Sequence, residues 1–365
     1  MNTTKLHIIA KALKKEMVRV GSVSLVNQAM QALQNQINQP QQPNHQQQLS
    51  NHLTNLYKKL EDSPVDDFSP AWRDAMEELS VSEEFGEKLE ARVRGIFERN
   101  QITPQTALEE MKKLHEDLSG TETQLTGLVS GLEYFGVGED ELETNECEVG
   151  IIIPRAYVKD NLKAFGAELI EIEKSLLVFS ELATGKREPL EIRQISSSEL
   201  SVFLDYIPEI GACIAIAVER IVALYKQLLE IKKLKKDLVA QEVPEDKLTG
   251  IEEYAASIVS PKLDELANEL MEKYGDHLDP ARKNEVSIEV RRSLNKIANR
   301  IDRGFNIELR VSEQAQDEEE EVTEDAQTQA AARQQILDSA SSIEYLEQVG
   351  EPVLFLPENS NETEE

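Results

Sequence analysis

The chain of 365 residues is poor in cysteine, in aromatic residues and in long apolar runs. Two cysteines, Cys147 and Cys213, cannot supply the disulfide framework of a secreted protein of this length. Aromatic residues make up only 5% of the chain, which argues against a β-sandwich built on aromatic pairs. The longest apolar run, residues 210–218, is far shorter than the roughly 20 residues of a membrane-spanning helix, and the N-terminus lacks the apolar core of a signal peptide. We therefore expect a cytoplasmic protein with reduced cysteines.

Positive charge is also scarce, because the formal net charge is −30 at pH 7. Residues 313–365 account for half of it, with sixteen acidic residues against a single base, Arg333. Nucleic-acid phosphates and anionic membranes both call for clustered lysine and arginine, so the charge disfavours these partners. We interpret the acidic region as a solubilising tail.

The residues that usually carry chemistry form no recognisable constellation. The five histidines are scattered, and none lies at metal-ligand spacing from a cysteine or a second histidine. The segment around Gly136 and Gly138 lacks the third glycine and the lysine of a phosphate-binding loop. We therefore expect no catalytic, cofactor-binding or metal-binding residues, no cofactor and no small-molecule substrate, and a chain that is not an enzyme.

What the sequence does contain is a hairpin pattern followed by a long helix. Residues 191–195 and 200–206 alternate in polarity around Ser196, Ser197 and Ser198, which is typical of two strands joined by a turn. A turn is the interpretation we favour for the serines; the alternative is a site that contacts a partner's backbone or a phosphate. The helix over 210–240 then carries apolar residues at spacings of three and four, close to the seam of a coiled coil. Its expected contact residues are Ile221, Leu224, Leu228 and Ile231.

The remaining patterns predict a mostly helical α+β protein, in which long amphipathic helices pack on a small antiparallel or mixed sheet. Further strands are expected at 149–153 and 305–312, and helices fill most of the rest. One helix is expected over 4–33 and another over 155–184, and the pairs Ser69-Pro70 and Thr103-Pro104 indicate two further helix starts. Glycine follows several of the expected helix ends. The expected divisions are 1–62, with a glutamine-rich connector over 34–48; a helical region over 63–137; a central α+β module over 148–312; an acidic linker over 313–325; a helix and short strand over 326–357; and a disordered tail over 358–365.

Two basic helices leave other partners open. Lys5, Lys11 and Lys14 surround the apolar residues of a helix near the N-terminus, which could lie on a membrane surface; packing on another helix is the interpretation we favour. A second basic helix runs from Arg282 to Arg303, without the interleaved aromatic residues of a single-strand nucleic-acid site.

The order of strand, helix, hairpin and long helix over 148–240, with Ile-Arg-Gln-Ile-Ser-Ser-Ser at 192–198 and Leu-Ser-Val-Phe-Leu at 200–204, is similar to small modules of uncharacterised bacterial proteins. Some of these resemble adaptor domains of defence systems. The resemblance implies scaffolding or oligomerisation and carries no catalytic residues.

These observations together favour a non-enzymatic adaptor or self-assembling scaffold that uses the helix over 210–240 as its packing surface. Its partner would be another protein or a second copy of the chain. The alternative is a membrane-surface protein anchored by its N-terminal helix. An enzyme whose site assembles only in the fold is the third possibility.

Overall fold

The computed structural model describes residues 3–137, 142, 146–196, 200–241, 249–312 and 324–343, and it divides into two compact units. Unit 1 is Met1–Asp140 and unit 2 is Glu141–Glu365. Unit 1 is helical, whereas unit 2 combines helices with a four-stranded antiparallel sheet. The predicted fold class, α+β with a large excess of helix, is therefore confirmed.

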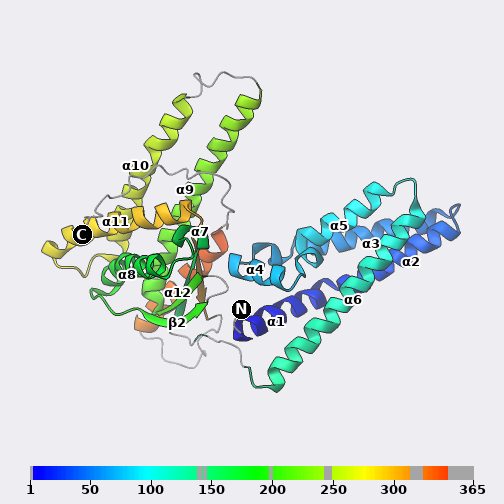
Figure 1. Cartoon of the computed structure of the whole chain (residues 1–365), viewed down its shortest axis with the longest axis horizontal. Coiled ribbons are helices and arrows are strands. Elements are labelled where there is room, and N and C mark those ends of the chain that lie inside the picture. The colour runs from blue at the N-terminus through cyan, green and yellow to red at the C-terminus, as the bar shows by residue number, and fades with distance from the viewer. Residues whose placement is uncertain are drawn as a thin grey trace. The chain divides into compact units, whose positions relative to one another are not determined.

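The helices of unit 1 pack along one another around an apolar core (Figure 1). They are α1 (Thr3–Val20), α2 (Ser22–Asn38), α3 (Pro43–Glu61), α4 (Pro70–Glu78), α5 (Gly86–Arg99) and α6 (Pro104–Tyr134), with short 3₁₀ helices at Pro64–Asp67 and Ser82–Glu84. One stripe of α6, including Leu108, Met111 and Leu114, is fully buried. Because α1 and α2 both contact α6, this stripe organises the unit.

Two helix boundaries in unit 1 differ from the sequence expectation. The helix expected over 4–33 divides at Gly21, whose positive φ of 66° places the backbone in the left-handed region that glycine adopts without strain. The glutamine-rich connector over 34–48 is largely helical, since α2 continues to Asn38 and α3 begins at Pro43. Glutamine is a good helix former, and pairs such as Gln34 with Asn38 hydrogen-bond one turn apart.

Unit 2 is built on a sheet with the strand order β2-β3-β1-β4. The strands are β1 (Cys147–Ile153), β2 (Glu191–Ser196), β3 (Leu200–Tyr206) and β4 (Asn306–Val311). In register, Val149 of β1 lies between Leu204 of β3 and Leu309 of β4, so one face of the sheet is apolar. The helices pack on this face, and the core of the unit forms between the two layers.

The helices of unit 2 are α7 (Arg155–Val158), α8 (Leu162–Thr184), α9 (Pro208–Ala240), α10 (Thr249–Tyr274), α11 (Pro280–Asp302) and α12 (Glu324–Ser342). The helix expected from residue 155 is split, because Lys159 and Asp160 adopt positive φ. Asn161 then caps α8 by accepting hydrogen bonds from the backbone of Lys163 and Ala164 at 2.9 and 3.1 Å. The short strand expected near the C-terminus and the tail over 358–365 lie outside the described residues.

Candidate interaction surface

The long helix α9 begins in the core of unit 2. Ile221, Leu224 and Leu228 are buried, and Ile231 is half-buried against the same core. Helices α8, α10, α11 and α12 all contact α9. The apolar stripe that the sequence suggested for assembly thus serves the interior of the unit along this stretch. Contact with a second chain through these side chains would require neighbouring helices to separate.

Beyond Ile231 the same helix is largely exposed. Figure 1 shows α9 and α10 running side by side away from the rest of unit 2. We call residues 229–241 of α9 with residues 249–258 of α10 the distal arm. Leu234, on the continuation of the apolar stripe, is 55% exposed, and Tyr254 of α10 is 59% exposed. The arm therefore presents apolar side chains that the described part of the chain does not bury.

The charge of this region differs from that of the chain as a whole. Residues 226–240 of α9 contain five lysines and only two acids, Glu230 and Asp237. Over the longer stretch 226–258 there are six lysines and seven acids, so the net charge is close to zero in a chain of −30. Two copies of this stretch therefore have little net charge with which to repel each other.

The serine cluster is only partly described. Ser196 ends β2 and lies opposite Ser201 of β3, half-buried. Ser197 and Ser198 lie outside the described residues, so the expectation that they form a turn or a contact site stays a prediction.

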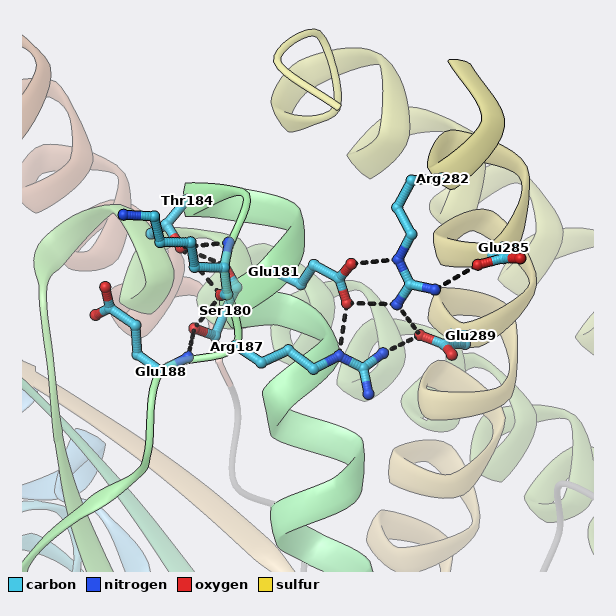
Figure 2. A network of polar contacts seen from close by, with 9 residues as sticks. Ser180, Glu181, Thr184, Arg187, Glu188, Arg282, Glu285 and Glu289 are labelled. Carbon is cyan, nitrogen blue, oxygen red and sulfur yellow. Dashed lines mark hydrogen bonds and ion pairs between the residues drawn. The ribbon is translucent and has the colours of Figure 1, made fainter. Parts of the chain in front are cut away.

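A network of charged side chains connects the end of α8 to α11 (Figure 2). Glu181 of α8 accepts hydrogen bonds from Arg187 at 2.6 Å and from Arg282 of α11 at 2.8 Å. Arg187 and Arg282 also pair with Glu289 of α11. The hydrogen bonds from Arg282 and Arg187 lower the pKa of Glu181 to about 2. A carboxylate held ionised in this way is unsuited to act as a general acid or base near neutral pH.

The contact between α8 and α11 continues as a ladder of acid–base pairs. Glu171 of α8 accepts from Lys296 at 2.6 Å, and Glu168 pairs with Arg300. Lys174 and Lys296 lower the pKa of Glu171 to about 2. Several cations of the basic helix over 282–303 are thus neutralised by acids of α8. This reduces the positive charge that α11 can offer to a nucleic acid.

A second polar cluster lies on the side of the sheet opposite the apolar core. Glu148 of β1 is buried, and its carboxylate lies 3.5 Å from Nε of Arg193 and 3.3 Å from Nε of Arg310. Arg193 occupies a bulge of β2 and also contacts Asp205 at 2.9 Å. Each charge has a partner of opposite sign, as a buried charge requires, so the cluster ties β2, β1 and β4 together.

The cysteines do not form a reactive site. Cys147 and Cys213 are buried and make no disulfide. Burial raises the pKa of Cys147 to about 12 and also raises the pKa of Cys213. Both therefore stay protonated and pack as small apolar groups. Among the described residues, no group of three or more metal-ligand side chains could hold a metal ion.

The apolar face of the N-terminal helix is covered within unit 1. Ile9, Leu13 and Met17 of α1 are buried in the core, and α1 packs against α6. Insertion of this face into a membrane surface would require α1 to leave that core. None of the described helices combines the length and the apolar character needed to cross a bilayer.

Comparison of the chain with protein-family models, with curated proteins and with solved structures found no significant match. Its function is therefore inferred from the geometry of the two units.

Proposed function

We propose that the chain is a non-enzymatic, self-assembling scaffold or adaptor, and that the distal arm contacts the distal arm of a second copy. One observation carries this proposal: the apolar stripe of α9 continues from the core into the arm, where Leu234 becomes exposed. Two arms packed together would form a four-helix contact in which these side chains are buried.

The charges support a second copy as the partner. In a chain with a net charge of −30, the stretch 226–258 is nearly neutral, so it has little net charge with which to repel the same stretch of a second copy. The proposal places this assembly in the cytoplasm, in keeping with two buried cysteines that form no disulfide.

The test uses the full chain and a double variant of the arm, Leu234→Asp/Val239→Asp. Light scattering at several concentrations should give a defined oligomer for the unaltered chain and a monomer for the variant, with equal helix content by circular dichroism. The matched control is Leu162→Asp, which changes a side chain that is 84% exposed at the start of α8 and should leave the oligomer intact.

A monomer for the unaltered chain at every concentration would refute self-assembly. An unchanged oligomer in the arm variant would refute the arm as its contact surface. Ile221 and Leu228 are unsuitable test positions, since a buried aspartate there would unfold the core.

A further inference from the structure

Helix α12 packs against unit 2 through a small set of side chains. It contacts α9 and β4, and its buried apolar residues are Ala332 and Ile336 within the helix and Ile343 directly after it. Ile336 is fully buried beside Gly211 of α9, where a methyl group on the glycine would approach its Cδ1 to 3.1 Å. We call the surface of α9 and β4 on which α12 packs the seat.

Polar contacts specify how α12 lies in the seat. Lys273 of α10 donates to Gln335 at 2.9 Å, Gln335 donates to Ser339 at 3.1 Å, and Ser339 donates to Glu219 of α9 at 2.7 Å. Ser339 is only 1% exposed. The seat therefore recognises the particular sequence of α12 as well as its apolar character.

The length of the connection between β4 and α12 limits how far α12 can lie from the rest of its own chain. Eleven residues, 313–323, separate the end of the described β4 region from α12, and a chain of that length can extend to about 36–40 Å. Residues 313–325 contain eight acids and no base.

We propose that the seat on α9 and β4 also binds α12 of a second copy, so that two chains exchange this helix. An exchanged α12 makes every contact that it makes within its own chain, and only the path of the connecting residues differs. This surface is separate from the distal arm. Two separate self-contacts on each chain would allow an assembly to grow beyond a dimer, which is what a scaffold requires.

The experiment is a charge complementation between two full-length variants. In the Ser339→Glu variant the new carboxylate lies against Glu219, so α12 of this variant cannot bind the seat of its own chain. In the Glu219→Lys variant the seat carries a lysine, which can pair with the carboxylate that Ser339→Glu introduces in the first variant. Both variants also carry Leu234→Asp/Val239→Asp, so that no dimer can form through the arm. Native mass spectrometry of the mixture should show at least about ten times as much heterodimer as the homodimer that the Ser339→Glu variant forms when measured alone. A tenfold ratio corresponds to a difference of about 1.4 kcal/mol in binding free energy.

The control carries Glu219→Lys and Ser339→Glu in one chain, where amide hydrogen exchange should show α12 protected again. If α12 is protected in this control while the mixture contains no heterodimer, α12 binds only its own chain and the proposal fails. If Ser339→Glu unfolds the unit, the pair Gln335→Lys and Lys273→Glu applies the same charge logic at a less buried contact. Because the arm is disabled throughout, the result does not depend on whether the arm proposal holds.

Discussion

Glu181 and Arg282 are 101 residues apart in the sequence, yet both oxygens of the carboxylate accept hydrogen bonds from the guanidinium. Arg187 donates to the same carboxylate, so Glu181 joins the end of α8, the following loop and the start of α11 (Figure 2).

Glu181→Gln should therefore destabilise unit 2. The amide removes the charge that both arginines share, and the expected loss is about 1–3 kcal/mol of unfolding free energy, as for other hydrogen-bonded groups that are mostly buried. Urea unfolding followed by far-UV circular dichroism would measure it. Glu285→Gln is the matched control, because Glu285 pairs with the same Arg282 but is 67% exposed, and its loss should be clearly smaller. Equal losses would show that Glu181 is not the centre of the network.

The ladder between α8 and α11 also predicts an acid-sensitive stability. The folded-state pKa of Glu171 and of Glu181 is about 2, below the value near 4.3 of an unfolded glutamate. A depressed pKa contributes stability that is fully present above the unfolded pKa and is lost as the pH falls toward the folded pKa. The unfolding free energy of unit 2 should thus decrease between about pH 5 and pH 2, and less steeply in Glu171→Gln/Glu181→Gln. Parallel pH profiles for the variant and the unaltered chain would contradict this assignment.

Gly211 of α9 packs directly against strand β1. A methyl group there would lie 2.4 Å from Sγ of Cys147, which is buried in β1 and has no room to move aside. We expect Gly211→Ala to cost about 1–3 kcal/mol in spite of the better helix propensity of alanine. Gly166→Ala in α8 is the control, because no atom lies within 4 Å of its new methyl group; it should be neutral or stabilising. Differential scanning calorimetry of the two variants would separate the steric effect from propensity.

Gly86 starts α5 with a φ of 52°, and its added methyl group would lie 2.1 Å from Oδ1 of Asp66. That carboxylate accepts the backbone N–H of Glu87 at 3.1 Å, so it holds the first turn of α5. Gly86→Ala should destabilise unit 1 more than Gly21→Ala, which has a similar φ of 66° and no atom within 4 Å. The single tryptophan, Trp72 of α4, packs against the core of unit 1, so its fluorescence reports the unfolding of this unit. Equal losses of unfolding free energy in the two variants would mean that backbone strain alone, without the contact to Asp66, determines the effect at Gly86.

Local patterns in the sequence were sufficient to locate several strands and helices. Apolar spacing located the strands at 191–195 and 200–206 and the long helix over 210–240, because the periods of two and 3.6 follow from backbone geometry alone. Proline and the residue before it located the starts of α4 and α6, at Ser69-Pro70 and Thr103-Pro104.

Which surface each element buries depends on how the helices and strands pack together. The stripe through Ile221, Leu224 and Leu228 has the same spacing whether it covers a core or faces a partner, and the packing of α8, α10, α11 and α12 places it inside. The pairing of α8 acids with α11 bases could not be predicted from the sequence either, since it joins residues more than a hundred positions apart. Such contacts depend on the folded path of the chain, which no local pattern encodes.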